Sequence, residues 1–138
     1  MGAVLVDSGP LVALFDGSDA DHRRCVDWLA SWDGILLTTP SVITEVAHIL
    51  GRRCGQGCQI DFVQWAAQSL RCDDGTSQDL PRIAAIMAKY RDLPADFADA
   101  SLVAMAERRA LYDVISVDAD FTVYCAAARR RFRNLLDG

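Results

Sequence analysis

The sequence lacks several features that would assign it to common classes of protein. No apolar run approaches the ~20 residues of a membrane-spanning helix, and no charged segment precedes a long apolar stretch at the N-terminus, so we expect a cytoplasmic protein without membrane contact. Its five cysteines are scattered without a CxxC pair, which is unlike a secreted disulfide framework. Neither GxGxxG nor a GxxxxGKS/T loop occurs, so nucleotide binding through a glycine-rich loop is excluded.

Basic residues are also in short supply. Thirteen arginines and one lysine stand against seventeen aspartates and two glutamates, which gives a net charge of −5 and a pI near 4.8. Such a chain lacks the basic field of a general nucleic-acid coat protein, so any polyanion it binds needs help from elsewhere. Aspartate predominates although glutamate is the better helix former, which indicates that some aspartates lie at caps, turns or a site.

Short apolar strands alternate with amphipathic helices along the 138 residues, a length that suits a single domain, 1–138. Strands are expected at 3–6, 35–38 and 113–117, with a weaker one near 132–136. Three helical patterns begin after start signals: a turn at 7–10, a capping box formed by Ser18 and Asp21, and Pro40. Three more are expected around 60–70, 83–90 and 96–109. This alternation predicts an α/β fold of three layers, α/β/α, with a central, mostly parallel sheet of about four to five short strands.

Two aspartates directly follow predicted strands. Asp7 comes after strand 3–6 and Asp118 after strand 113–117. Ligands of open α/β sheets bind outside the carboxyl ends of the strands, so both carboxylates are expected on one rim. Taken singly, each also fits an ordinary turn or cap residue.

Asp99 is harder to explain as a surface residue. Leu102, Val103 and Ala106 lie three, four and seven positions after it, so they share its face of the predicted helix. A carboxylate that faces a core costs several kcal/mol unless it is neutralised, paired or bound to a metal. No arginine or lysine in the same turns shares this face, so a divalent cation is the simplest partner.

Two further acids flank this position in the predicted rim. Asp96 is suited to be the N-cap of the same helix, and it also lies near the positive end of the helix dipole, where a ligating carboxylate is favoured. Glu45 borders the apolar stripe of the helix begun by Pro40, or is an exposed first-turn acid that complements the dipole. His48 is expected to be a partly buried structural imidazole.

The four acidic positions Asp7, Glu45, Asp99 and Asp118 fall at two strand ends and two helix beginnings, all of which can converge on one rim. Hard oxygen donors without histidine or thiolate select Mg²⁺ or Mn²⁺ over zinc. Such ions commonly activate water for displacement at a phosphodiester. The sequence therefore favours a Mg²⁺ or Mn²⁺ site at this rim.

Four segments resemble the motifs of the PIN-domain family, specifically the VapC-type toxin ribonucleases of bacterial toxin–antitoxin pairs. Residues 4–14 (VLVDSGPLVAL) resemble the first strand with its aspartate, and residues 39–46 (TPSVITEV) resemble the segment that carries the glutamate. Residues 96–104 (DFADASLVA) resemble the third acidic motif and residues 116–121 (SVDADF) the last, although Ser116 stands where threonine is usual.

The resemblance implies Mg²⁺- or Mn²⁺-dependent endonucleolytic cleavage of RNA and inhibition by a cognate antitoxin. We also expect a homodimer. The resemblance also implies Asp7 and Asp99 as metal ligands and Glu45 as a ligand or water-orienting base. It further implies Asp118 as an additional ligand or second-metal contact, and Ser8 as a donor to a phosphate oxygen or a metal-bound water. Asp96 and Asp120 depart from the family pattern, because they are additional acids that compete with Asp99 and Asp118 as ligands. Apart from the resemblance, the run of arginines at 129–133 is the densest basic patch, so we expect Arg129 and Arg130 to contact RNA or an acidic antitoxin tail.

One alternative from another class remains. A non-catalytic PIN-like module would bind protein or RNA through the same fold without cutting it. Metal titration separates the two, because only the enzyme predicts Mn²⁺-dependent cleavage that Asp99→Asn abolishes. Trp28 and Trp32 on an early helix are candidates for a dimer or antitoxin groove, with burial in this chain's own core as the alternative.

Overall fold

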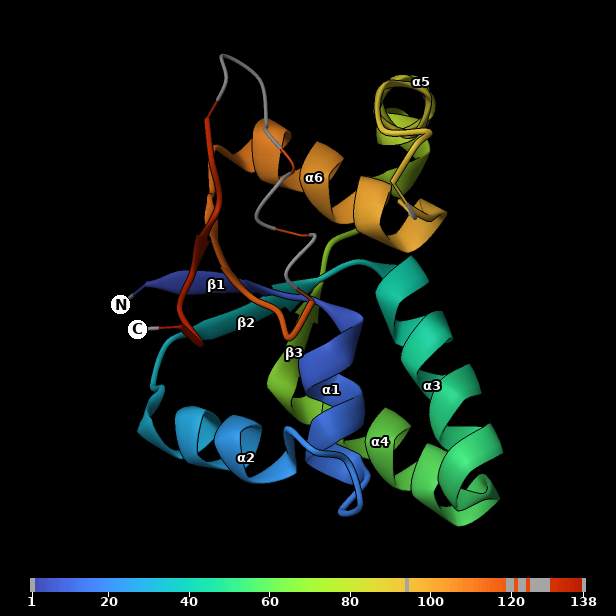
Figure 1. Ribbon diagram of the computed structural model, residues 1–138, viewed down its shortest axis with the longest axis vertical. Helices are drawn as coiled ribbons and strands as arrows, with labels where there is room; N and C mark the ends of the chain where they lie inside the picture. The colour runs from blue at the N-terminus through green and yellow to red at the C-terminus, as the bar shows by residue number, and fades with distance from the viewer. Residues whose placement is uncertain (1, 94, 119–120, 122–123, 125–129, 138) are drawn as a thin grey trace.

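The computed structural model describes residues 2–93, 95–118, 121, 124 and 130–137 (Figure 1). Within these ranges one sheet has the order β3-β2-β1-β4-β5, and every neighbouring pair is parallel. Its strands are β1 (Ala3–Val6), β2 (Ile35–Thr38), β3 (Leu70–Cys72), β4 (Asp113–Ile115) and β5 (Arg133–Asn134). The helices are α1 (Ser8–Phe15), α2 (His22–Ser31), α3 (Pro40–Cys54), α4 (Gln56–Ser69), α5 (Thr76–Lys89) and α6 (Phe97–Arg109).

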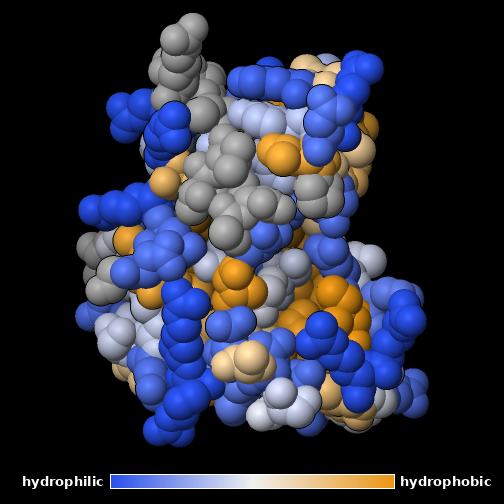
Figure 2. All heavy atoms as spheres, in the orientation of Figure 1, coloured by the Kyte–Doolittle hydropathy of each residue, from blue (hydrophilic) through white to orange (hydrophobic). Residues whose placement is uncertain are grey.

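The helices cover both faces of the sheet, which confirms the predicted α/β/α fold. Figure 1 shows α5 and α6 on one side, with α1, α2 and α4 on the other, while α3 runs from the sheet towards α4. The central strand β1 is almost wholly apolar because it is buried on both faces, and Val4, Leu5 and Val6 have no exposed surface. Figure 2 shows a largely hydrophilic surface in this orientation, with hydrophobic residues reaching it between α1 and α3.

The carboxyl ends of the parallel strands meet the beginnings of three helices. Asp7 is the only residue between β1 and α1, and Thr39 is the only one between β2 and α3. The backbone N–H of Asp7 donates to the carbonyl of Ile115 at 3.1 Å, which joins the ends of β1 and β4. Thr39 and Ser101 share a hydrogen bond of 2.8 Å between their hydroxyls, and this buried contact joins the start of α3 to α6. Side chains at these positions are therefore fixed to one rim.

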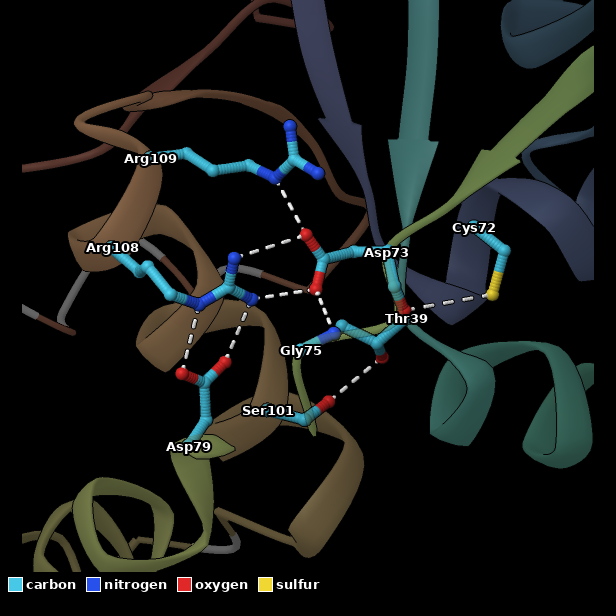
Figure 3. A network of polar contacts seen from close by, with 8 residues as sticks. All are labelled: Thr39, Cys72, Asp73, Gly75, Asp79, Ser101, Arg108 and Arg109. Atoms are coloured by element: carbon cyan, nitrogen blue, oxygen red, sulfur yellow. Dashed lines mark hydrogen bonds and ion pairs between the residues drawn. The ribbon is translucent and has the colours of Figure 1, made fainter. Parts of the chain in front are cut away.

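A polar network fixes α6 from its other end (Figure 3). The buried carboxylate of Asp73, just after β3, accepts hydrogen bonds from the guanidinium groups of Arg108 and Arg109 on α6. Arg108 also donates to both oxygens of Asp79 on α5, at 2.9 and 3.0 Å. These hydrogen bonds connect α5, α6 and the end of the edge strand β3. The shared carboxylate of Asp73 is only 1% exposed, so the network is shielded from solvent at its centre.

Two local expectations were wrong, and one strand was missed. No turn separates β1 from α1, because the helix begins at Ser8 and Pro10 is accommodated in its first turn, where no intrahelical N–H bond is lost. The capping box is absent: the N–H and hydroxyl of Ser18 donate to Asp16, and α2 begins only at His22. The strand β3 was missed because its three residues continue directly from α4 and show no pattern of their own.

Other boundaries moved by a few residues. The expected strands 113–117 and 132–136 are confirmed as the shorter β4 and β5. The stacked rings of Trp28 and Trp32, 5.2 Å apart, are partly buried against the core, which favours the own-core alternative over an open groove. No helix in the described part of the chain is both long and apolar enough to cross a membrane.

Candidate active site

Asp7 is a buried carboxylate at the end of the central strand. It is 3% exposed, and its Oδ1 accepts a hydrogen bond of 2.8 Å from the N–H of Ser8. Its Oδ2 accepts a bond of 2.9 Å from the hydroxyl of Ser116. Burial raises the pKa of Asp7 to about 6 despite these two bonds, and the charge of Asp118 adds to the rise. Asp7 is therefore fixed in orientation, but its negative charge lacks full compensation.

The loop after β4 is organised by Ser116. The Ser116 hydroxyl accepts a hydrogen bond of 3.1 Å from the N–H of Asp118 while it donates to Asp7. Asn134 on β5 makes two hydrogen bonds with the backbone of Ser116. Its Nδ2 donates to the Ser116 carbonyl at 2.8 Å, and its Oδ1 accepts from the Ser116 N–H at 3.2 Å. Asp118 is exposed and lies close enough to influence the pKa of Asp7, so the structure places it on the predicted rim.

Asp99 faces the same rim from the first turn of α6. Burial, together with the charges of Asp7, Asp96 and Glu45, raises the pKa of Asp99 to about 8. Tyr124, itself 1% exposed, has its hydroxyl 3.5 Å from Oδ2 of Asp99 and is the donor of this long contact. The sequence argument that Asp99 shares the apolar face of its helix is confirmed, since Leu102, Val103 and Ala106 are all buried.

Asp96 is the N-cap of α6, as one of the two sequence interpretations predicted. Its Oδ1 accepts a hydrogen bond of 2.9 Å from the N–H of Asp99, and its side chain is otherwise exposed. The cap does not remove Asp96 from the acidic cluster, because its charge raises the pKa values of Asp7, Glu45 and Asp99. One residue therefore starts the helix and adds to the negative potential beside it.

Glu45 completes the cluster from α3. Burial, the charge of Asp96 and a hydrogen bond with Asp96 together raise the pKa of Glu45 to about 7. The Ser8 hydroxyl opposes this rise. The Oε2 atom of Glu45 is buried without a hydrogen-bond partner. A buried carboxylate oxygen without a donor is costly, so this atom favours a bound cation or water.

The donor set fits a hard divalent cation. Burial, hydrogen bonds and neighbouring carboxylates dominate the pKa values of Asp7, Glu45 and Asp99, and no lysine or arginine of the described chain is among the main influences. Within the described residues, no group of three or more His, Cys, Asp or Glu side chains is arranged as a ready-made metal site. Magnesium does not require one, because it usually retains several waters and is held by one or two carboxylates. The site therefore has the ligand chemistry of Mg²⁺ or Mn²⁺.

Not all predicted site residues come together. The Arg130 guanidinium packs 4.8 Å from the ring centroid of Tyr112, which precedes β4 and so lies at the opposite end of that strand from Asp118. Arg130 is thus not beside the carboxylates. Arg129 and Asp120 lie outside the described residues. Ser8 is where it was expected, next to both Asp7 and Glu45.

Sequence reasoning missed several supporting residues. The hydroxyl of Ser116 was noted only as a motif position, yet it connects Asp7 to the Asp118 loop. Asn134 and Tyr124 gave no signal, because their roles depend on contacts across 18 and 25 residues of sequence. His48 was expected to be partly buried, but it is exposed beside Glu45 in a groove between α3 and α6.

Comparison with known proteins agrees with this geometry. The family model of the PIN domain matches residues 4–127. A curated relative, ribonuclease VapC26 of Mycobacterium tuberculosis (strain ATCC 25618 / H37Rv), is 23% identical over 116 residues, which cover 83% of this chain and 86% of the relative. The crystal structure of Mycobacterium tuberculosis VapC20, a toxin that cleaves the sarcin-ricin loop, superposes with a TM-score of 0.81 at 21% identity, covering 87% of this chain and 93% of the other.

Proposed function

Because the chain belongs to the PIN-domain family, we propose that it is a Mg²⁺- or Mn²⁺-dependent endoribonuclease that hydrolyses RNA phosphodiester bonds. One observation supports the proposal: Asp7, Glu45 and Asp99 come from three separate elements and all have raised pKa values, and the charge of Asp7 reaches both Glu45 and Asp99. The ribonuclease relative VapC26 supports the same reaction class.

Asp7 and Asp99 are the residues that would hold the cation, and Asp118 would add a ligand or contact a second ion. When bound, such an ion activates water and offsets the charge that develops at phosphorus. Asp7 is suited to direct ligation because Ser8 and Ser116 fix both of its oxygens in place. Asp99 is suited because its negative charge is the least compensated in the cluster, as its pKa of about 8 indicates.

The other residues act on water and phosphate. The unpartnered Oε2 of Glu45 is free to accept a hydrogen bond from the attacking water and to take its proton as the water oxygen bonds to phosphorus. The hydroxyl of Ser8, beside Glu45, donates to a phosphate oxygen or to this water. The bond from phosphorus to the leaving oxygen then breaks, and a proton from solvent or from a protonated carboxyl completes that group.

We further propose that the protein is the toxin of a toxin–antitoxin pair that acts in the cytoplasm and is inhibited by a cognate antitoxin. The names of the relatives support this partner, because both carry the designation VapC and one is described as a toxin. Arg130 lies away from the carboxylates, so its contact would be with a distal part of an RNA or with an acidic antitoxin segment rather than with the phosphate that is cut.

The proposal is tested with the purified chain and a mixture of short RNAs, in Mn²⁺ or in EDTA. We expect cleavage in Mn²⁺ only, and we expect Asp99→Asn to reduce it at least about 100-fold while circular dichroism shows an intact fold. Asp61→Asn is the matched control, because Asp61 is an exposed carboxylate on α4 outside the site.

Two results would contradict the proposal in different ways. Cleavage that persists in EDTA or in Asp99→Asn would rule out this metal centre as its source. RNA binding without cleavage by the wild-type chain under any divalent cation would instead favour the non-catalytic PIN-like module.

A further inference from the structure

A groove opens beside the carboxylates, between α3 and the start of α6. Its volume is about 460 Å³. One wall is a stripe along α3 that includes Ser41, Glu45 and His48, at positions i, i+4 and i+7 of the helix. The other wall is formed by Asp96 and Phe97. Glu45 and Asp96 belong to both the groove and the carboxylate cluster, so the two sites are continuous.

Phe97 is the most unusual residue of the groove. It is 40% exposed, whereas the next residues of α6 that face the core, Ala98 and Ala100, are 6% and 1% exposed. The other large hydrophobic side chains in the described chain with comparable exposure, Ile60, Val63 and Leu80, are all aliphatic. An aromatic ring left in water contributes little to folding, and an exposed ring beside a polar site is typical of ligand stacking.

The polar wall has hydrogen-bonding capacity to spare. Neither Ser41 nor His48 makes a side-chain hydrogen bond or ion pair within the part of the chain that the structure describes. A hydroxyl and an imidazole together supply donors and acceptors at the groove, opposite the Phe97 ring. An aromatic platform with such groups at its edge is the usual way proteins bind an unpaired nucleobase.

We propose that this groove binds an unpaired base of the RNA next to the phosphate that is cut, with Phe97 as the stacking surface. The inference rests on the proposed nuclease function. A strand whose phosphate reaches Glu45 must place a neighbouring nucleotide beside the groove, because Glu45 lines both. Only a base outside a helix can turn its face to the ring, so the substrate would be single-stranded or looped at this point.

The test uses an RNA oligonucleotide that the wild-type chain cuts in Mn²⁺, and four variants. We expect Phe97→Ala to lower kcat/KM about 10- to 100-fold, mainly through KM, because stacking contributes to binding. Phe97→Trp keeps an aromatic face and should stay within about threefold of wild type, whereas Phe97→Leu keeps only apolar bulk and should resemble Phe97→Ala. Leu80→Ala is the control for truncating an exposed hydrophobic residue, because Leu80 lies on α5 outside the groove.

An abasic substitution identifies the base. Each nucleotide flanking the cleavage point is replaced in turn by an abasic one, and at one of the two positions the wild-type rate should fall as much as it does in Phe97→Ala. The same abasic RNA should then be cut by Phe97→Ala no more slowly than the intact RNA, since the contact is lost already. Independent losses that multiply would show that ring and base do not touch.

A binding measurement separates this inference from the nuclease proposal. With Ca²⁺ in place of Mn²⁺, 2-aminopurine at the identified position should be quenched on binding to the wild-type chain and to Phe97→Trp, but not to Phe97→Ala. Normal cleavage and quenching by Phe97→Ala, with cleavage still lost in Asp99→Asn, would overturn the base-binding groove and leave the nuclease intact. If Phe97→Ala instead loses only the binding of an antitoxin, the ring belongs to a protein interface and the inference is wrong.

Discussion

At the scale of single residues, Asp99 lies on a helix face whose other residues belong to the hydrophobic core. An ionised carboxylate at this position lowers the stability of the fold, and the loss depends on pH. The pKa of Asp99 is raised to about 8, that of Glu45 to about 7 and that of Asp7 to about 6. An acid with a raised pKa stabilises the fold fully only below its unfolded-state value, and that stability is lost as the pH rises through the folded-state value. The metal-free protein should therefore lose stability between about pH 4 and pH 8.

Asp99→Asn tests this directly. The amide has nearly the same shape without the charge, so the metal-free variant should be more stable than the wild type at pH 8, by about 1–2 kcal/mol, with the difference shrinking towards pH 5. Urea unfolding in EDTA at several pH values measures it. Adding Mn²⁺ at pH 8 should stabilise the wild type and not the variant. If the free energy of unfolding depended on pH in the same way in both proteins, Asp99 would not be the source of the pH-dependent loss of stability.

Ser116 orients Asp7, and its removal should affect both stability and activity. Ser116→Ala deletes the donor to Oδ2 of the buried Asp7, which should destabilise the fold by about 1.5–3 kcal/mol at neutral pH and lower cleavage at least tenfold. Ser116→Thr retains the hydroxyl and should recover most of the activity. Ser31→Ala is the control, since its hydroxyl donates to a carbonyl on the exposed surface of α2. Equal effects of the two alanine variants would contradict the assignment.

At the scale of secondary-structure elements, the contact between α5 and α6 depends on the space that Gly75 leaves for the Arg108 guanidinium. A Cβ at Gly75 would lie 2.3 Å from Nη2 of Arg108. That guanidinium cannot easily move, because it donates to both Asp73 and Asp79. Gly75→Ala should therefore destabilise the fold by about 1–3 kcal/mol in urea unfolding. Gly57→Ala has no atom within 4 Å of its new Cβ and lies inside α4, so it should be neutral or stabilising.

The same network makes an acid-sensitive contribution. Burial alone would raise the pKa of Asp73, but hydrogen bonds from Arg108, Gly75 and Arg109 together lower it to about 2. The stability from this lowered pKa is present above the unfolded-state value near 3.9 and is lost as the pH falls towards 2. Asp73→Asn should be less stable than wild type at pH 7, and the difference should narrow below pH 4 in thermal melts. A difference that stays constant from pH 7 to pH 2 would contradict this role.

The elements themselves were largely predictable from sequence, because their signals are local. The apolar run at 3–6 and the proline at position 40 are sufficient to place β1 and the start of α3. Asp99 could be identified from helical periodicity alone. Tyr124 and Asn134 could not, because a side chain whose partner lies on a distant segment leaves no pattern in its own segment. β3 was missed for a related reason: only pairing with β2 makes its three residues a strand.

At the scale of the whole molecule, acidic side chains neutralise many of the arginines in the described ranges. Arg24, Arg53, Arg82, Arg109 and Arg133 each form an ion pair. With a net charge of −5, the protein as a whole should repel RNA. Attraction to a phosphate must then come from divalent cations at the carboxylates, which reverse the local sign.

This charge balance predicts how RNA binding depends on salt and metal. With Ca²⁺ bound in place of Mg²⁺ so that the RNA stays intact, affinity by fluorescence anisotropy should be at least about tenfold higher than in EDTA. Because many arginines are already paired, we expect few contacts with phosphates. The logarithm of the RNA association constant should then fall with log[KCl] with a slope smaller than about 3 in magnitude, since each phosphate contact on a single strand contributes ~0.7. Tight binding in EDTA with a steeper slope would instead indicate a basic surface formed by the arginines, with Arg129 and Arg130 the first to substitute by alanine.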